Sequence, residues 1–527
     1  MSAVDDLCRS YLDLRWHFNP SDASSDGVAA LDARLGSFDD ESMHAHLAAF
    51  RSLEGAIEEL EPADLAQEID CTALLDDLRT HLFRFEHEQP QVRNPGFWLT
   101  HLFEGIFALL VRQGSLEERA PAVLERLKAA PAFLDQARHT LKAPPLVFVD
   151  SALQALGGGG QLIAEAVGVM RAAAPELAAD LDAAGQEALQ ALTAFGRALG
   201  SGIAPSDDPR AYAVGEEQFE RRLHHEHAIR GGAPELWRYG LHLIEETQAR
   251  LVSVAERLNG GDWRAMIERL RADQAVPDVM AAYQEEAARA HAFMLARGAV
   301  PEAPVPMEIV PTPPFLESLV PFAAYQPPPV ELGGPGYFFV TAPKSPADGT
   351  QCTYEIPSIV VHEAWPGHHV QVTATQELAS EVRRHVRTPV NVEGWALYAE
   401  TLMFEEGYFA TPEARLFHLN DLLWRAVRIV LDVGLHTRGM TPAEAVDYLT
   451  GALPMERKNA EAEVRRYCAM PTYQLSYAIG RRELLTLRDA WRARAGADAP
   501  LRDFHAAFFS YGGLPVALAR WGMGLDE

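Results

Sequence analysis

The chain has 527 residues, of which 48% are hydrophobic and 23% are charged. These fractions are typical of globular proteins and exclude a wholly disordered or collagen-like chain. The 46 Lys and Arg residues are outnumbered by 74 Asp and Glu residues, so the net charge is −28. Because so acidic a surface repels phosphate backbones and anionic membranes, we expect neither a nucleic-acid nor a membrane partner.

Four cysteines (Cys8, Cys71, Cys352 and Cys468) lie far apart and form no CxxC pair. This spacing argues against a zinc ribbon and against a disulfide-rich secreted scaffold. Residues 1–16 are acidic and lack the apolar stretch of a secretory signal, and no run of 18 apolar residues indicates a transmembrane helix. Together these features predict a cytoplasmic protein.

The first 300 residues show helical rather than strand-like patterning. Leu74, Leu78 and Leu82 recur at helical spacing, for example. The glycine run 157–160 lacks the GK[ST] sequence of a phosphate loop, and we expect a flexible turn there. Strong helix formers dominate the stretches 113–142, 161–199, 234–258 and 262–297.

The composition changes at about residue 301. Residues 301–336 are rich in proline, which excludes long helices. The aromatic run 336–341 that follows is bounded by turn residues and is the best strand candidate of the chain. Helical texture then returns from 355 to about 510. We therefore predict a mostly α fold with a small β element near 305–355.

The most informative stretch begins with His362 and Glu363, after an apolar run. A His-Glu pair opens the zinc signature HExxH, in which two histidines one helical turn apart bind zinc and the Glu is the general base. Here the second position is Pro366, which cannot bind a metal. The next histidines are His368 and His369, six and seven residues after His362.

A straight helix would keep these histidines apart, because six or seven residues span about 9–10.5 Å along its axis. Zinc–nitrogen bonds of about 2.0–2.1 Å cannot cover that gap. A shared metal therefore requires a bent or bulged helix. Pro366-Gly367 can supply the bend, since proline removes a backbone hydrogen bond and glycine tolerates unusual dihedral angles.

A carboxylate on a second helix would complete three protein ligands and leave one position for water. Glu393 lies 31 residues after His362, far enough for a helix, a loop and an antiparallel return. Glu393 and Glu400 lie two turns apart on one face of the same predicted helix.

The motifs HEAWPGHHVQ (362–371) and VEGWALYAE (392–400) resemble those of the bacterial domain-of-unknown-function 885 family, which is similar to helical gluzincin metallopeptidases of the neurolysin and carboxypeptidase Taq kind. Residues 464–467 and 471–480 resemble the family's C-terminal block. One departure is Pro471-Thr-Tyr-Gln, where the family usually has Pro-Gly-Gln. The resemblance covers about 210–520 well and the first 200 residues loosely.

This resemblance implies a large helical fold with a central cleft and a Zn²⁺ site. His362 and Glu393 would bind zinc, and Glu363 would be the general base. His368 is the preferred second histidine ligand, with His369 as the alternative or as a partner of the ligands.

Further residues would act on the substrate if the comparison holds. Tyr477 is the candidate donor to the oxyanion, which needs stabilisation besides the metal. Arg466 or Gln474 would bind a substrate carboxylate or backbone. The strand 336–341, with Tyr337, would hold an extended peptide at a sheet edge.

The sequence thus predicts one helical unit, 1–527, with an N-terminal half 1–210 and a metal-site half 211–527. The predicted function is zinc-dependent cleavage of amide bonds in short peptides. The alternatives are a zinc amidohydrolase acting on a non-peptide metabolite and a helical binding protein with a degenerate, non-catalytic metal site. A second histidine cluster, HHEH at 224–227, matches no metal pattern and is expected on a solvated helix face.

Overall fold

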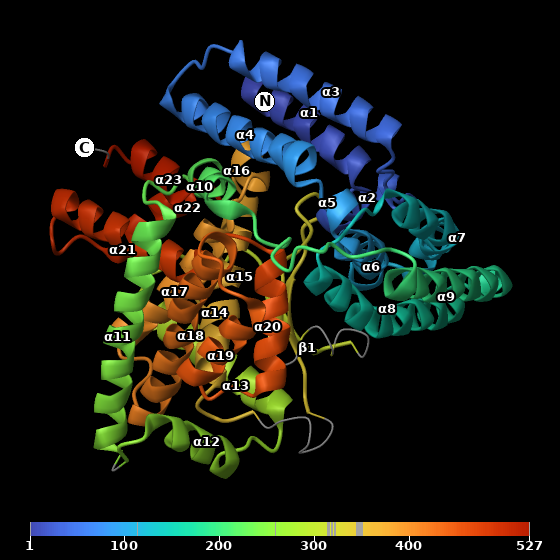
Figure 1. Cartoon of the computed structure of the whole chain (residues 1–527). Helices are drawn as coiled ribbons and strands as arrows, with labels where there is room; N and C mark the ends of the chain where they lie inside the picture. Colours follow the sequence, from blue (N-terminus) through green and yellow to red (C-terminus); the bar gives the residue numbers. More distant parts are fainter. Residues whose placement is uncertain are drawn as a thin grey trace. The chain divides into compact units, whose positions relative to one another are not determined.

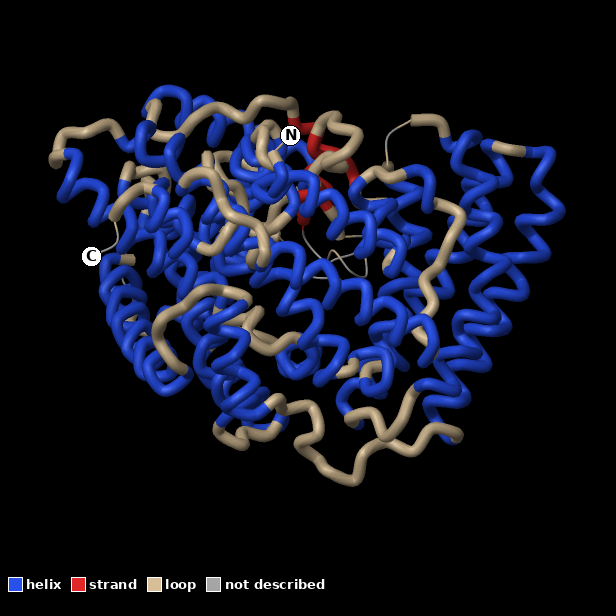
Figure 2. The backbone as a smooth tube through the Cα atoms, turned by 90° about the horizontal axis from the view of Figure 1, so that it is seen from above, coloured by secondary structure: helices blue, strands red, loops and turns tan. Residues whose placement is uncertain are grey.

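The computed structural model describes residues 2–112, 114–258, 260–313, 317, 320, 323–343 and 351–525. Helices dominate it, and its small sheet lies within the predicted β region, so the mostly α fold class is confirmed (Figures 1 and 2). The chain divides into two compact units. Unit 1 comprises Met1–Ala63, Leu74–Tyr212 and Pro329–Gly334, and unit 2 comprises Asp64–Ala73, Ala213–Pro328 and Pro335–Glu527.

The regular secondary structure of unit 1 is entirely helical over its described residues. Side-chain caps start several of its helices: Ser2 and Asp5, for example, each accept a hydrogen bond from the other's backbone N–H at the start of α1. Its elements are α1 (Ala3–Phe18), α2 (Pro20–Asp26), η1 (Ala29–Leu31), α3 (Asp40–Glu58), the second half of α4 (Leu65–Phe83), η2 (Arg84–Glu88), α5 (Pro90–Arg93), α6 (Pro95–Val111), α7 (Leu116–Thr140), α8 (Leu146–Ala173), η3 (Pro175–Leu177) and α9 (Ala178–Ser201).

The glycine run 157–160 lies inside α8, so the expected flexible turn is wrong. Its glycines allow neighbouring helices to approach closely. A Cβ atom on Gly159 would lie 1.8 Å from the ring of Phe103 on α6. Gly185 of α9 is packed in the same way against Val167 of α8, where a Cβ would lie 2.5 Å away. Helix packing therefore outweighs the low helix propensity of glycine here.

A membrane span was not expected, yet α8 is long and apolar enough, by length and composition, to cross a membrane. Core helices of soluble proteins meet the same criterion, and 28% of its apolar window is buried within the protein. Among the described helices α8 is the one that qualifies, and this finding by itself establishes no membrane span.

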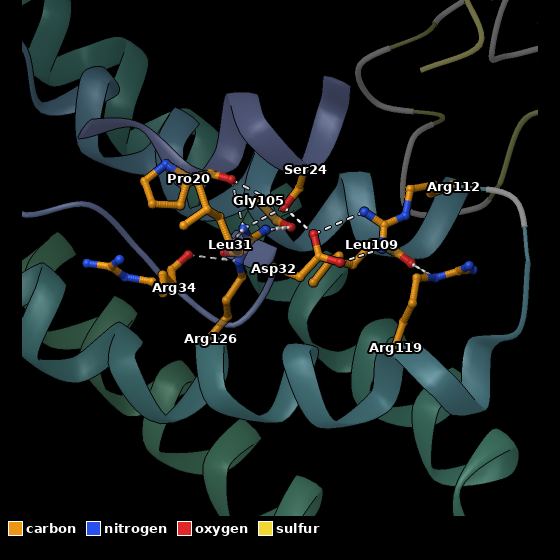
Figure 3. A network of polar contacts seen from close by, with 10 residues as sticks. All are labelled: Pro20, Ser24, Leu31, Asp32, Arg34, Gly105, Leu109, Arg112, Arg119 and Arg126. Atoms are coloured by element: carbon orange, nitrogen blue, oxygen red, sulfur yellow. Dashed lines mark hydrogen bonds and ion pairs between the residues drawn. The ribbon is translucent and has the colours of Figure 1, made fainter. Parts of the chain in front are cut away.

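A buried arginine joins α7 to α2, to α6 and to the loop after η1 in unit 1 (Figure 3). Arg126 of α7 is fully buried, and burial lowers the pKa of its guanidinium to about 10. The guanidinium donates to main-chain carbonyl oxygens and to one hydroxyl, those of Pro20, Arg34, Gly105 and Ser24. Arg34 lies in the loop after η1, whereas Pro20 begins α2 and Gly105 lies inside α6, so the arginine links three segments of unit 1 through their carbonyl oxygens.

Unit 2 contains all candidate functional residues. Its long helices α11 and α18 and the helices α14 to α17 are labelled in Figure 1. The elements are α10 (Gly215–His225), α11 (Ala233–Arg257), α12 (Trp263–Asp273), α13 (Val279–Arg297), β1 (Met307–Pro311), β2 (Ala323–Gln326), β3 (Gly336–Val340), α14 (Ile356–Glu363), α15 (His368–Gln376), α16 (Glu381–His385), α17 (Pro389–Glu405), α18 (Pro412–Thr437), α19 (Pro442–Ala452), α20 (Arg457–Ala469), α21 (Ser476–Ala495), α22 (Leu501–Phe509) and α23 (Val516–Gly522).

The sheet has the strand order β1-β3-β2. Strand β3 pairs in parallel with β1 and antiparallel with β2, so it is the central strand. The expectation that residues 336–341 form a free sheet edge is therefore wrong, and β2 is an edge strand instead. Phe338 and Val340 of β3 are buried in the core. This burial explains the central place of β3 in the sheet, because a hydrophobic strand buries the most apolar surface there.

Helices α17 and α21 approach through a pair of glycines. A Cβ on Gly394 would lie 2.5 Å from the Cα of Gly480, and a Cβ on Gly480 would lie 2.0 Å from the carbonyl oxygen of Val390. Neither position has space for a side chain. This contact matters for the site because Glu393 precedes Gly394 and Tyr477 lies one turn before Gly480.

Candidate metal centre

The helix that begins the HE motif stops directly after it. Helix α14 ends at Glu363 and α15 begins at His368, with a cis peptide bond between Trp365 and Pro366. Gly367 lies so close to α14 that a Cβ would be 1.8 Å from the carbonyl oxygen of His362. The rings of His362 and His368 are consequently only 4.8 Å apart between centroids. The structure thus shows the interruption of the helix that the histidine spacing required.

Three side-chain atoms converge at this break. Oε2 of Glu393, on α17, lies 3.5 Å from Nε2 of His362 and 3.5 Å from Nε2 of His368. The ligand atoms of the three residues all lie within 4.8 Å of one another. Two atoms bound at about 2.1 Å to a tetrahedral zinc are about 3.4 Å apart, close to the observed separations. Glu393 Oε2 is buried and has no hydrogen-bond donor among the described residues, as expected of a metal-binding oxygen.

His369 points elsewhere and uses both of its ring nitrogens. Its Nδ1 lies 3.0 Å from the hydroxyl of Tyr325, and its Nε2 lies 3.1 Å from the carbonyl oxygen of Val305. The carbonyl can only accept, so Nε2 donates to it and the Tyr325 hydroxyl donates to Nδ1. Burial lowers the pKa of His369 to about 4, which keeps the ring neutral. The geometry therefore favours His368 over His369 as the second histidine.

A second carboxylate orients His362 from behind. Nδ1 of His362 donates to Oε1 of Glu400 at 2.8 Å, and Oε2 of Glu400 lies 3.4 Å from Nδ1 of His418. Glu400 is fully buried. Sequence reasoning placed Glu393 and Glu400 on one helix face but assigned no role to Glu400 or His418. The seven-residue spacing was the available signal, since it lets both carboxylates of α17 reach the same imidazole.

The histidines and carboxylates of the candidate centre shift one another's pKa values. Burial alone would lower the pKa of His362, but the neighbouring carboxylates of Glu393 and Glu400 outweigh this effect and raise the pKa to about 9. Burial alone would also raise the pKa of Glu393, but His362 and His368 hold it well below its usual range. Glu393 is therefore ionised, which is the protonation state that a metal ligand needs.

Glu363 is held beside an edge of the sheet. Its Oε2 accepts a hydrogen bond of 3.0 Å from the backbone N–H of Tyr325 in β2. Because alternate residues of a strand point their N–H and C=O groups to the same side, those of Ala323 share this side of β2. The carboxylate thus lies where an extended chain could add to the sheet.

Two tyrosines from the C-terminal block reach the centre. The Tyr473 hydroxyl donates to Oε1 of Glu393 at 2.6 Å. The ring of Tyr477 stacks on that of His362 with centroids 6.1 Å apart, and the guanidinium of Arg428 lies 4.9 Å from the Tyr477 ring. Sequence reasoning identified Tyr477 but gave no role to Tyr473 or Arg428. Nothing in the spacing alone distinguished Tyr473 from a packing residue.

The candidate substrate-binding residues have different surroundings. Arg466 is substantially exposed and donates to both carboxylate oxygens of Glu463 on its own helix, α20. Gln474 is fully buried, and neither atom of its side-chain amide has a hydrogen-bond partner among the described residues. Tyr337 is half-buried on the central strand β3, where its ring stacks with that of Phe339. None of the described contacts joins these three residues to the three converging ligand atoms.

Two solved structures share this fold along almost the entire chain. One, described as "a putative lipoprotein of unknown function" from Shewanella oneidensis, has a TM-score of 0.81 and 21% identity and covers 99% of this chain and 100% of its own. The other, a "putative lipoprotein" from Colwellia psychrerythraea, has a TM-score of 0.84 and 18% identity and covers 100% of this chain and 99% of its own. No curated protein matches the chain.

These descriptions overturn the predicted cytoplasmic location. Both similar proteins are described as "putative lipoprotein", and a lipoprotein is held at a membrane by an attached lipid. Location depends on targeting segments and lipid attachment sites, which are separate from the folded core. Overall charge, cysteine spacing and hydropathy therefore could not determine it.

The sequence profile of the family described as "Bacterial protein of unknown function (DUF885)" matches residues 20–523. The match extends the resemblance seen in the HEAWPGHHVQ and VEGWALYAE motifs to nearly the whole chain, including residues 20–200. The chain therefore belongs to the DUF885 family of bacterial proteins.

Proposed function

We propose that this protein is a zinc-dependent hydrolase that cleaves amide bonds of short peptides. The observation that carries the proposal is the convergence of His362, His368 and Glu393, with Glu363 next in sequence to the first ligand. Three protein ligands of the types His, His and Glu leave a fourth position open, which is the pattern of catalytic rather than structural zinc sites.

The donor set fits zinc. Imidazole nitrogens and one carboxylate oxygen suit this metal, and Glu400 supplies the carboxylate that commonly supports a zinc-binding histidine. When bound, zinc supplies a Lewis acid that polarises a carbonyl and lowers the pKa of water to about 7.

Residues of the chain itself would transfer the proton, stabilise the oxyanion and bind the peptide. Glu363 takes the proton of the attacking water and passes it to the leaving amine, with Tyr325 N–H orienting its carboxylate. The Tyr477 hydroxyl donates a hydrogen bond to the developing oxyanion. The outward side of β2, at Ala323, offers backbone groups to an extended peptide, which supports a peptide over a compact metabolite.

The metal content of the purified protein tests the first part of the proposal. After dialysis against zinc and removal of the excess, we expect about one zinc per chain by elemental analysis. A His362→Ala/His368→Ala double variant is expected to retain none. Zinc-free wild-type protein after this loading would refute the proposal.

The Glu363→Gln variant tests the chemistry. It is expected to keep its zinc but to lose at least about 100-fold in kcat on short peptides, since general base catalysis contributes about 10²–10⁴-fold. Glu377→Gln, at an exposed carboxylate after α15, is the matched control and is expected to match the wild type. Cleavage of acylated amines but not of peptides would identify an amidohydrolase. Zinc binding without any turnover would identify a binding protein.

A further inference from the structure

Tyr473 makes the one hydrogen bond to Glu393 Oε1 that the structure describes, at 2.6 Å. We infer that Tyr473 is a positioning residue that makes Glu393 present a single oxygen, Oε2, to the metal. This inference rests on the proposed zinc site. It extends that site by a residue to which the sequence assigned no role.

The two oxygens of Glu393 have different surroundings. Oε1 is engaged by the Tyr473 hydroxyl, whereas Oε2 faces Nε2 of both His362 and His368 at 3.5 Å. A carboxylate without a donor on Oε1 can rotate about its terminal bond and turn both oxygens toward a cation. The tyrosine hydroxyl removes this freedom because it keeps one oxygen hydrogen-bonded away from the nitrogens.

The segment that carries Tyr473 is itself anchored. Between α20 and α21, Thr472 adopts the left-handed conformation with φ +65°. The backbone N–H groups of Thr472 and Leu475 donate to the two oxygens of buried Asp432, each at 3.1 Å. A single carboxylate of α18 therefore holds the backbone on both sides of Tyr473.

A second anchor comes from the HHEH cluster. His224 and His225 are exposed as expected, but His227 is fully buried, so the predicted solvated face is wrong for this residue. Its Nε2 lies 3.0 Å from the Thr472 hydroxyl and its Nδ1 lies 2.7 Å from the Thr388 hydroxyl, directly before α17. His227 thus links the Tyr473 segment to the start of the helix that carries Glu393.

Metal binding to the Tyr473→Phe variant tests the inference. The zinc dissociation constant, from competition with a chelator, is expected to rise about 10–100-fold, as for other residues that support metal ligands. Tyr448→Phe on α19 loses a hydroxyl that makes no described contact with His362, His368 or Glu393, and it is expected to keep the wild-type affinity. Tyr473→Gln retains an N–H donor and is expected to bind zinc more tightly than Tyr473→Phe.

Cobalt(II) provides a readout that a general loosening of the fold would not change. A second carboxylate oxygen on the metal raises its coordination number, and the visible absorption of Co²⁺ weakens as the geometry departs from tetrahedral. We expect this absorption to fall in Tyr473→Phe and to be retained in Tyr448→Phe. An unchanged cobalt spectrum in Tyr473→Phe overturns the inference, even if the affinity falls.

The experiment separates the two proposals. If the wild type binds neither zinc nor cobalt, the proposed function fails. If the wild type binds both metals and Tyr473→Phe binds them with equal affinity and an equal spectrum, only the inference on Tyr473 fails. Should Tyr473→Phe not fold, as judged by circular dichroism, the cobalt spectrum is measured on Tyr473→Leu, where a weakened absorption supports the inference and an unchanged one overturns it.

Discussion

Replacing Gly367 by alanine is expected to disrupt the candidate metal centre. The added Cβ would lie 1.8 Å from the carbonyl oxygen of His362, whereas ordinary contact begins at 3.4 Å, so α14 and α15 must separate by up to about 1.6 Å. Metal sites tolerate errors of only about 0.2 Å in their ligand distances. We therefore expect Gly367→Ala to lose more than about 100-fold in zinc affinity.

The same substitution should also lower stability. Overpacking of a well-packed interior costs about 1–3 kcal/mol, and here the clash is with backbone, which cannot rotate away. Thermal unfolding of the zinc-free protein measures this loss, and chelator competition measures the zinc affinity separately.

Gly451→Ala is the matched control for this experiment. Gly451 is an exposed glycine of α19, and a Cβ atom added to it would meet no neighbouring group within 4 Å. Alanine there is expected to stabilise the protein by about 0.5–1 kcal/mol. A Gly367→Ala protein that binds zinc as tightly as the wild type and melts at the same temperature would refute the idea that close contact at the helix break builds the site.

Three further predictions concern other parts of the structure. Glu400→Gln is expected to weaken zinc binding about 10–100-fold, measured by chelator competition, because His362 loses the carboxylate behind it; an unchanged affinity would contradict this. Arg126→Leu is expected to cost about 3–5 kcal/mol in urea unfolding, because several buried carbonyl groups lose their donor, while exposed Arg138→Leu on the same helix should change stability by less than about 0.5 kcal/mol; equal effects would refute the role of the network. Burial lowers the pKa of His436 and of His505 to about 4, below about 6.5 in the unfolded chain, so their contribution is present above pH 6.5 and is lost as the pH falls toward 4. Each of these two histidines should lower the unfolding free energy by about 2 kcal/mol as the pH falls from 7 to 5. An unfolding free energy that does not change with pH over this range would contradict the reasoning.

Much of the candidate site could be predicted because it depends on spacing along the chain. Pro366 at the position of the second histidine, followed by Gly367 and two histidines, required a break in the helix, and the structure has it. The spacing of Glu393 and Glu400 placed both carboxylates on one helix face. Such inferences succeed because helix geometry is local and nearly constant.

Other features depend on packing partners that are distant in sequence. The glycine run 157–160 has low helix propensity, yet it is helical because Phe103 of α6 occupies the space that side chains would fill. The run 336–341 was recognised as a strand, but its central place depended on pairing with β1 and β2. His227 is buried, where it contacts the hydroxyls of Thr388 and Thr472, whereas His224 and His225 of the same HHEH cluster are exposed.

The sequence by itself determined the mostly α fold class, the family and the residue types able to bind a metal. It left the second histidine open, because His368 and His369 are adjacent and either could face the metal from a bent helix. The tertiary structure favours His368, since Tyr325 and Val305 occupy both nitrogens of His369 and leave His368 facing Glu393. It also revealed Tyr473, whose contact with Glu393 joins residues 80 positions apart and leaves no periodic trace in the sequence. Periodicity reports which face of an element a residue occupies, whereas only folding decides what that face meets.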